Sequence, residues 1–399
     1  MVDFYLNISI ILTDNVVVND NAKGDGKNSL FVFSKQLNQR TMGMTLKQDK
    51  SLRKTNSSFH TTLKDVAKLA GVSTKTVSRV VNHQGEISAE TRERVQQAIE
   101  KLGYRPNILA RSLIHKRTNT LGVVAWGIDY FGPSRTVVGI EQQAHQLNYS
   151  LLLNLVDRPD NGNSEQVLDA LITHRVDGII WAVPEVGNNR KWLENSHLEQ
   201  LPPIVFLSME PQPGLAIIAV DNFSGAKQAT QHLIDQGRRK IGIITGPLSW
   251  WEARERFRGW ETAMHQAGLE TPASLVIEGE WAAASGEQGL STLLLKAPDI
   301  DALFASSDQI ALGALSTAHR LGRKIPHDLA IVGFDNIPEA ACFWPPLTTV
   351  YQHLINVGRI AVQTLHRMIE TNRQSKKSEE ATVTLVPPEL IIRSSSLQS

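Results

Sequence analysis

Three residues near position 75 have side chains of types that can read base edges in duplex DNA: Thr74, Lys75 and Arg79. Lys and Arg can donate hydrogen bonds to guanine O6 and N7, and the Thr methyl group can pack against thymine. If this segment is a helix with its valines turned inward, all three side chains lie on the outer face near the helix start. Neighbouring residues that could hold phosphate groups are Lys64, Ser73, Ser78, Asn82 and Ser88.

Three helices must position these side chains. Thr62 can cap the first helix, and Gly71 can end it in the left-handed conformation that a tight turn needs. Ser73 can cap the second helix and Ser88 the third, which stops at Gly103. Two helices joined by a tight turn and closed by a third make a helix-turn-helix. Its predicted core consists of Leu63, Val66, Ala67, Ala70, Val77, Val80, Val81, Val95, Ala98, Ile99 and Leu102.

The charge distribution agrees with a polyanionic partner for this region only. Residues 61–117 contain eleven Lys and Arg against five Asp and Glu, a balance of +6. Because the net charge of the chain is +1, the remaining residues sum to −5. This distribution is expected when only the cationic segment contacts nucleic acid and the mildly acidic rest of the chain does not.

The length of 399 residues predicts two or three domains. Residues 1–60 show no sustained period and are rich in Asn, Lys, Ser and Gly from residue 19 onward, which predicts a disordered extension. We expect no membrane span, because no apolar run approaches the roughly 18 residues that a span needs. We also expect no secretory signal, because Asp3 stands where a basic residue is usual and a small-residue cleavage site is lacking. Cys342 is the only cysteine, which excludes an internal disulfide and fits a cytoplasmic location.

From Leu121 onward, short apolar strands alternate with helix-length stretches. This alternation is typical of parallel sheets covered by helices on both faces. The chain has about nine strand–helix units, which is more than one doubly wound sheet usually contains. We therefore expect the units to form two lobes. The predicted fold class is therefore α/β, with an N-terminal all-α helix-turn-helix headpiece and a two-lobed parallel α/β domain.

A family resemblance adds to this interpretation. The stretch "TLKDVAKLAGVSTKTVSRVVN", with "ISAETRERVQQAIEKLGYRPNILARSL" after it, resembles the headpiece of the LacI/GalR family of bacterial transcriptional regulators, and the match extends to about residue 395. The resemblance implies that Thr74, Lys75 and Arg79 read bases. It also implies that the segment from Asn107 to Leu113 forms a hinge helix on DNA, with Leu113 as a minor-groove wedge. Without the resemblance, Leu113 would be a linker residue packed on the next domain.

The resemblance also sets the expected domain boundaries. The headpiece spans residues 61–105 and the hinge and linker 106–118, and a sugar-binding and dimerisation domain resembling periplasmic sugar-binding proteins spans 119–396. Its first lobe comprises about 119–218 and 351–378, and its second about 219–348 and 380–396.

Six effector-binding residues follow from the same resemblance. Arg256 matches an arginine that grips sugar hydroxyls, and Asp335 matches an acceptor carboxylate, although an Asp at a strand end could instead cap the next helix. Trp281 could stack on a sugar face or pack in the lobe core. Tyr130, Ser208 and Ser307 occupy further cleft positions.

The chain departs from lactose-repressor-like members near these residues. It carries Trp250, Trp251 and Glu252 where those members have small serines, and Ser208 where they have an aspartate. The added bulk and aromaticity argue for a different glycan, a β-glucoside or a disaccharide. Asp221 and Asn222 are expected to cap the next helix and steady the lobe interface.

The predicted function is a repressor that acts as a homodimer on a pseudo-palindromic operator and is released when a sugar or glycoside binds between its lobes, without cofactor, metal or catalytic residues. The resemblance favours release over corepression, and the residues alone do not fix the sign of the response. One alternative is a transport-type sugar receptor, which would explain only the second half of the chain. Another is a sugar-processing enzyme, which would need paired carboxylates across the cleft, and the sequence assigns only Asp335 there.

Overall fold

The computed structural model of the chain describes residues 61–82, 84–105, 117–159, 164–195, 200–373 and 382–397. The predicted extension over residues 1–60 and the predicted hinge helix, with Asn107 and Leu113, lie outside the described residues. Among the described helices, none combines the length and the apolar character needed to cross a bilayer.

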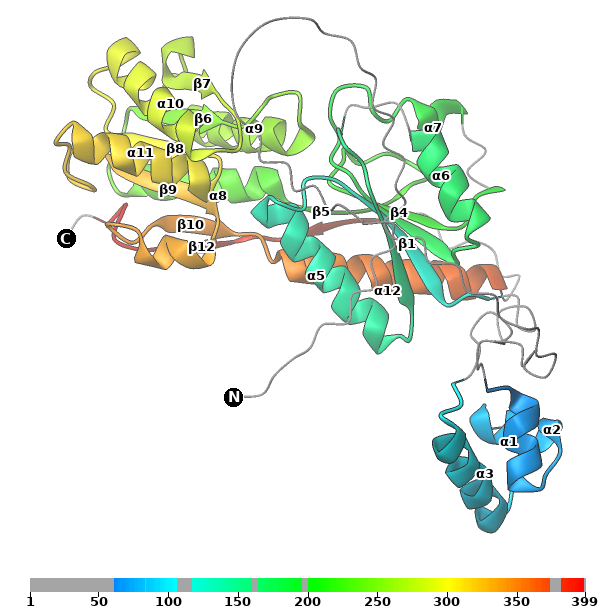
Figure 1. Cartoon of the computed structure of the whole chain (residues 1–399). Helices are drawn as coiled ribbons and strands as arrows, with labels where there is room; N and C mark the ends of the chain where they lie inside the picture. The colour runs from blue at the N-terminus through cyan, green and yellow to red at the C-terminus, as the bar shows by residue number, and fades with distance from the viewer. Residues whose placement is uncertain are drawn as a thin grey trace, which may run out of the picture. The chain divides into compact units, whose positions relative to one another are not determined.

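The headpiece consists of α1 (Leu63–Ala70), α2 (Thr74–Val81) and α3 (Ala89–Leu102), drawn in blue and teal in Figure 1. The carboxylate of Asp65 accepts hydrogen bonds from the backbone and side chain of Thr62 at the start of α1. Ser73 Oγ accepts from Thr76 N at the start of α2. Gly71 has φ of 64°, which favours glycine, and it ends α1 as predicted. These local signals confirm the predicted helix boundaries.

The headpiece core forms where the predicted apolar stripes meet. Val66, Val77 and Val95, one from each helix, are completely buried. Leu63, Val81, Ile99 and Leu102 of the predicted stripes pack against this core and are partly buried. Thr61 Oγ1 donates to the carbonyl of Leu102, which ties the start of the described chain to the end of α3. The three helices therefore form one small packed unit.

The first lobe is built on a six-stranded parallel sheet in the order β11-β5-β4-β3-β1-β2. Helices α5 (Phe131–Gln146) and α12 (Leu354–Arg373) cover one face, and α6 (Ser164–Thr173) covers the other. A short helix, α7, spans Trp192–Asn195. The strands are β1 (Thr120–Ala125), β2 (Ser150–Leu155), β3 (Gly178–Ala182), β4 (Ile204–Leu207), β5 (Ala216–Val220) and β11 (Val383–Val386).

The second lobe repeats this design with the sheet order β12-β10-β9-β8-β6-β7, in which only β12 is antiparallel among the described strands. Helix α8 packs against α9, and α10 packs against α11. Its strands are β6 (Ile241–Thr245), β7 (Val276–Glu278), β8 (Ala302–Ala305), β9 (Ala330–Asp335), β10 (Thr348–Tyr351) and β12 (Glu389–Ile391). Its helices are α8 (Asn222–Asp235), α9 (Trp251–Gln266), α10 (Ala283–Lys296) and α11 (Asp308–Arg320), with short 3₁₀ turns at Ala273–Leu275 and Pro338–Cys342.

Two predicted lobe boundaries were wrong. Strand β11, which was assigned to the second lobe, pairs in parallel with β5 in the first lobe, with Val383 opposite Ile217. The predicted boundary at residue 218 falls inside β5. The cause is that the chain passes between the lobes after β5, β10 and β11, and short apolar strands carry no local mark of the sheet that they join.

Helices α5 and α12 approach so closely that only glycine fits at their crossing. A Cβ on Gly358 would lie 2.3 Å from the carbonyl oxygen of Thr136, which is backbone and cannot move aside. We therefore expect Gly358→Ala to destabilise the protein by about 1–3 kcal/mol, as overpacking does. The urea-unfolding midpoint measures this effect.

The matched control is Gly132→Ala in the first turn of α5, where an added Cβ meets no atom within 4 Å. Its stability should stay the same or rise by up to about 1 kcal/mol. Equal unfolding midpoints for Gly358→Ala and the parent protein would contradict the predicted backbone clash.

Candidate functional site

The outer face of the headpiece presents the predicted base-reading residues to solvent. Thr74, Lys75 and Arg79 are all exposed on α2, opposite the buried Val77 and Val80. A conformation that buried them against their own chain would have excluded contact with DNA. The exposed face can donate hydrogen bonds to base edges in the major groove, and the Thr74 methyl group can pack against a base there.

The predicted phosphate-binding residues surround this face. Lys64, Ser73 and Ser88 are exposed, and both serines cap helix N-termini, where backbone N–H groups favour anions. Ser78 and Asn82 are half-buried and bonded to each other, with Asn82 Nδ2 donating to Ser78 Oγ at 3.2 Å. These two side chains have therefore less freedom to meet a phosphate than the other three.

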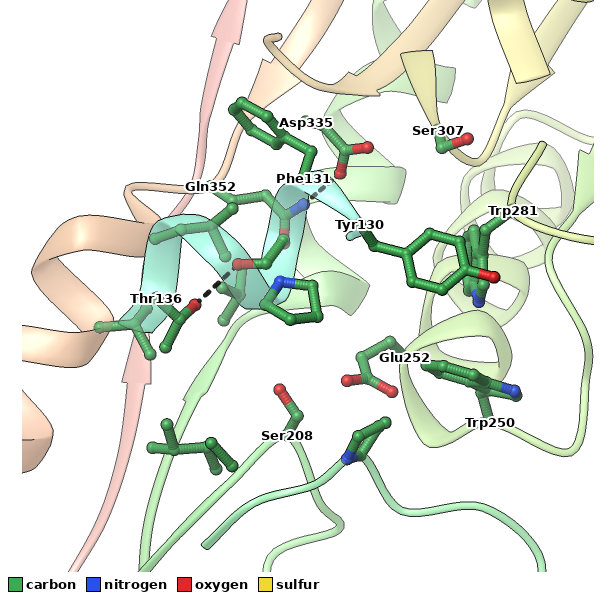
Figure 2. Close-up of a pocket in the computed structure, with 18 of the residues that line it drawn as sticks. Tyr130, Phe131, Thr136, Ser208, Trp250, Glu252, Trp281, Ser307, Asp335 and Gln352 are labelled. Atoms are coloured by element: carbon green, nitrogen blue, oxygen red, sulfur yellow. Dashed lines mark hydrogen bonds between the residues drawn. The ribbon is translucent and has the colours of Figure 1, made fainter. Parts of the chain in front are cut away.

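A pocket lies between the two lobes, and residues of both lobes line it. Figure 2 shows side chains from both lobes converging on it. Strand ends of the two sheets contribute to it, as expected for parallel α/β folds. All six residues predicted to bind effector line this pocket: Tyr130, Ser208, Arg256, Trp281, Ser307 and Asp335.

Arg256 is a buried residue of α9, and three hydrogen bonds and an aromatic ring fix the position of its side chain. Nε donates to Asn222 Oδ1 at 2.7 Å, and Nη1 donates to the carbonyl oxygen of Ser306 at 2.6 Å. Nη2 donates to Gln352 Oε1 at 3.3 Å, and the guanidinium lies 3.8 Å from the centre of the Phe334 ring. These bonds use three of the five N–H donors of the guanidinium.

Asp335 provides the facing carboxylate at the end of β9. Its Oδ1 lies 3.9 Å from Arg256 Nη1 and accepts a hydrogen bond from Gln352 Nε2. Burial raises the pKa of Asp335 to about 6, although Arg256, Gln352 and the backbone N–H of Asp308 oppose that rise. The alternative that Asp335 caps the next helix is not supported, because Ile337 is the N-terminal cap residue of the 3₁₀ turn that follows and no side chain caps that turn, and Ile337 N donates to Asp308 Oδ2 at 2.8 Å.

Burial and repulsion from Asp335 also raise the pKa of Asp308 well above its ordinary value. Asp308 faces Thr349, whose hydroxyl donates to its Oδ1 at 2.5 Å. Two neighbouring carboxyl groups are thus buried here, and of the two Asp335 is the one that lines the pocket. A ligand that donates hydrogen bonds to Asp335 would favour its ionised form.

Aromatic rings form a continuous wall of the pocket. Trp126 lies 5.5 Å from Tyr130 and 5.3 Å from Trp250, and Trp250 lies 5.9 Å from Trp281, all between ring centres. Trp281 lines the pocket and also packs against the core of the second lobe. Trp126 was missed by the sequence analysis, because a Trp at a strand end is equally typical of a core residue.

Glu252 is a second pocket carboxylate that the sequence analysis noted only as a departure. Burial raises its pKa, while hydrogen bonds with its own backbone and with the Ser208 side chain, and the charges of Arg256 and Arg190, oppose that rise. Its Oε2 is buried and has no hydrogen-bond partner in the described part of the chain. The pocket therefore contains two carboxylates, not the single one predicted.

Asn222 and Gln352 also hold Arg256, and neither role was predicted. Asp221 caps α8 as expected, because its Oδ1 accepts from Ser224 N at 2.9 Å. Asn222, predicted as a cap, instead turns its amide oxygen to Arg256. Partners 34 and 96 residues away in sequence give no local signal.

Backbone contacts join the first lobe to the start of α9. Trp251 N donates to the Glu185 carbonyl at 3.2 Å, and Gly187 N donates to the Ser249 carbonyl at 3.2 Å. The Glu185 carboxylate lies 3.6 Å from Arg254 Nη2. These contacts set the position of the pocket-lining turn at Trp250 relative to the first lobe.

Metal binding finds no support in the described residues, among which no group of three His, Cys, Asp or Glu side chains is placed to hold an ion. The chemistry that the pocket offers is hydrogen bonding to two carboxylates and an arginine, with indole faces for stacking. This combination suits a polyhydroxylated ring, whose hydroxyl groups donate and accept while its apolar face packs on aromatic rings.

Comparison with known proteins finds a family match for the headpiece and another for the two-lobed domain. Residues 62–107 match the description "Bacterial regulatory proteins, lacI family", and residues 230–396 match a periplasmic binding protein-like domain. The HTH-type transcriptional repressor PurR of Actinobacillus pleuropneumoniae serotype 3 (strain JL03) is 35% identical over 337 residues, which cover 84% of this chain and 98% of the relative. The HTH-type transcriptional regulator DegA of Bacillus subtilis (strain 168) shows the same identity and coverage.

The similar solved structures are also transcriptional regulators. The Lac repressor dimer bound to operator and the anti-inducer ONPF is 31% identical, with a TM-score of 0.75, and the match covers 85% of this chain and 99% of that one. A complex of the transcriptional regulator CelR with cellobiose is also 31% identical, with a TM-score of 0.63 and coverage of 84% and 99%.

Proposed function

Because this chain belongs to the LacI family of bacterial regulatory proteins and is a DNA-binding transcriptional regulator, we propose that a sugar or glycoside in the interlobe pocket controls its affinity for operator DNA. The alternative of a transport-type receptor is wrong, since the helix-turn-helix and the full-length relatives both belong to regulators.

The observation that carries the effector proposal is the pairing of Arg256 with Asp335 inside an aromatic-walled pocket. A ligand with adjacent hydroxyl groups can donate to the carboxylate and accept from the guanidinium at once. The CelR neighbour binds cellobiose in its solved complex, which supports a glycoside as the ligand class.

The proposed mechanism couples two sites in a homodimer. Two linked headpieces on a pseudo-palindromic site gain effective concentration, so each half-site can be weak while the whole binds tightly. Effector that closes the lobes would separate the paired hinges and release the operator. Operator and effector must then weaken each other's binding by the same factor.

A combined binding experiment tests this function. The full-length protein is mixed with DNA from the region upstream of its own gene, and the mobility shift is measured with and without cellobiose, gentiobiose, maltose and lactose. We expect a shift that at least one sugar abolishes, and a rise in melting temperature with the same sugar. A specific shift that no sugar changes, with no thermal stabilisation, would overturn the effector assignment.

In this proposal the chain acts in the cytoplasm and binds its effector without converting it. Glu252 and Asp335 both line the pocket, so hydrolysis deserves a direct control. Prolonged incubation of cellobiose with the protein, followed by chromatography, should return the sugar unchanged. Release of glucose would favour the enzyme alternative.

We expect effector affinity to depend on pH through Asp335. Its pKa of about 6 means that the carboxylate is protonated below that pH and loses its capacity to accept sugar hydroxyls there. The affinity should therefore be constant above about pH 7 and fall by up to tenfold per pH unit below about pH 6. Titration calorimetry between pH 5 and 8 measures this profile.

The control is Asp335→Asn, which keeps the shape of the side chain but removes the titration. Its sugar affinity should be lower at pH 7.5 and should lose the component of the pH dependence that is centred near 6. The same midpoint in Asp335→Asn as in the parent protein would assign the titration to another group.

A further inference from the structure

Arg117 belongs to the predicted linker between the headpiece and the first lobe, and it binds three different parts of that lobe. Its Nε donates to Asp177 Oδ2 at 3.1 Å, and its Nη1 lies 3.2 Å from Glu370 Oε1. Its Nη2 donates to the hydroxyl group of Tyr149, and the guanidinium lies 5.2 Å from the centre of that ring. The Arg117 side chain is only 20% exposed. One side chain thus fixes the point where the chain from the headpiece enters the first lobe.

Asp177 holds the end of the linker to the sheet itself. It directly precedes β3, and its carboxylate also accepts from Thr118 N at 3.2 Å and from Asn119 N at 2.9 Å. Thr118 and Asn119 directly precede β1, which pairs with β3. Because both strands belong to one sheet, the contact between Arg117 and Asp177 keeps its length when the first lobe moves as a body.

Glu370 belongs to a different element, the last turn of α12. His366, one turn earlier on the same helix, reaches Arg117 through Tyr149, whose hydroxyl group lies 3.0 Å from His366 Nδ1. Tyr149 directly precedes β2. Two residues of α12 therefore meet the amino ends of the strands at the place where the linker arrives.

The opposite end of α12 lines the pocket. Leu354 and Val357, in its first turn, are pocket residues, and Gln352 lies two residues before the helix. Gln352 binds two groups of the second lobe, because its Oε1 accepts from Arg256 and its Nε2 donates to Asp335. A ligand that moves Arg256 or Asp335 therefore acts on the start of α12.

Helix α12 is long and closely packed, so a displacement of one end reaches the other. Its 20 residues span about 30 Å at a rise of about 1.5 Å per residue. Figure 1 shows it along the first lobe beside α5, and the two helices leave no space for a Cβ at Gly139 or Gly358. Helices packed in this way slide by small distances as bodies. Such a shift changes the distance from Glu370 to Arg117 but not that from Asp177 to Arg117.

We propose, resting on the effector role of the pocket, that Arg117 is a positioning residue whose pairing with Glu370 transmits the state of the pocket through α12 to the linker. Asp177 holds Arg117 in both states, whereas Glu370 holds it in only one position of α12. Coupling between two sites requires contacts that differ between two states, and this pair supplies such a contact. Effector and operator then favour different positions of α12.

Hydrogen exchange on the full-length protein tests this connection without a known effector. The protein is measured alone and with a duplex selected in vitro from a random pool. We expect the duplex to slow exchange in the headpiece and to change it by about threefold or more at the start of α12, next to the pocket. In Glu370→Gln the headpiece should respond as in the parent protein, whereas the response at the start of α12 should fall to less than half.

The second measurement is the factor by which a sugar lowers the affinity for the selected duplex. Cellobiose, gentiobiose, maltose and lactose are compared, and the sugar with the largest effect on the parent protein is used. The Arg117–Glu370 pair is partly exposed, and such pairs change an equilibrium by up to about fivefold. Glu370→Gln should therefore reduce the factor by about two- to fivefold.

Two comparisons separate this role from a general effect of the substitution. Arg373→Gln is the matched control, because Arg373 Nη1 pairs with the same Glu370 Oε1 at 3.3 Å but belongs to α12 itself. It should behave as the parent protein in both measurements. In a double-mutant cycle, Glu370→Gln should have no further effect in Arg117→Gln, because the pair is already broken.

Each outcome decides the proposal. Either an equal response at α12 or an equal factor in Glu370→Gln and the parent protein would overturn the role of the pair, while the sugar-responsive function stays intact. A loss of the same size in Arg373→Gln, or additive effects in the cycle, would overturn it as well. If no sugar of the panel alters operator binding, the effector assignment fails, and hydrogen exchange still decides the connection between linker and pocket.

Discussion

Replacing Arg79 with alanine is expected to abolish most of the preference for operator over random DNA. A side chain that makes a good bidentate contact contributes about 1–3 kcal/mol of discrimination, and a symmetric dimer loses it twice. The expected loss of specific affinity is therefore about 30-fold to more than 10,000-fold. Arg79 is exposed, so its removal should leave stability within about 0.5 kcal/mol of the parent.

The measurement is a competition mobility-shift assay with duplexes selected in vitro from a random pool. Lys101→Ala is the matched control, since it also removes one exposed positive charge of the headpiece, in the last turn of α3. The control should weaken specific and random binding equally. An Arg79→Ala protein that prefers the selected duplex as strongly as the parent would show that α2 is placed wrongly on DNA. Sugar binding should be unchanged in both variants.

Arg256→Ala is expected to have the converse effect, with effector binding lost and DNA binding retained. The guanidinium donors and the positive charge that faces Asp335 disappear together, so affinity should fall by more than about 100-fold. The same change leaves the buried carboxylate of Asp335 without its cation, which should destabilise the protein by about 3–5 kcal/mol. Calorimetry and urea unfolding measure these two effects separately.

A milder variant guards against loss of folding. Arg256→Lys keeps the positive charge but lacks the planar fork, so it should remain folded and still lose about tenfold or more in sugar affinity. Arg258→Ala serves as the control on the same helix, because its side chain is 61% exposed and pairs with Glu255. Unchanged sugar affinity in Arg256→Lys and Arg256→Ala alike would remove Arg256 from the effector site.

The headpiece was predictable nearly to the residue because its signals are local. A capping residue, a left-handed glycine and an apolar stripe each act within one or two helical turns. The predicted residues that lie toward the ends of the helices, Leu63, Val81, Ile99 and Leu102, pack against the core but are only partly buried. The exposure of Thr74, Lys75 and Arg79 followed from helix periodicity alone.

The pocket was predictable only through the family resemblance, and then incompletely. The resemblance supplied six residues that the structure brings together in one pocket. It did not supply Glu252, Trp126 or Gln352, because this chain differs from lactose-repressor-like members around Glu252 and because no spacing rule marks the other two. The groups that hold Arg256 are the Asn222 side chain of α8, the backbone carbonyl of Ser306 just after β8 and the Gln352 side chain just after β10.

The sequence by itself determined the two-part organisation, the three headpiece helices and the outward face of α2, because periodicity and capping operate between residues close in the chain. Only the tertiary structure decided that β11 joins the first sheet, that Asn222 holds Arg256 and that Glu252 shares a pocket with Asp335. These outcomes depend on segments far apart in the chain that meet when two similar lobes fold. Short apolar strands and single polar residues do not encode their partners locally.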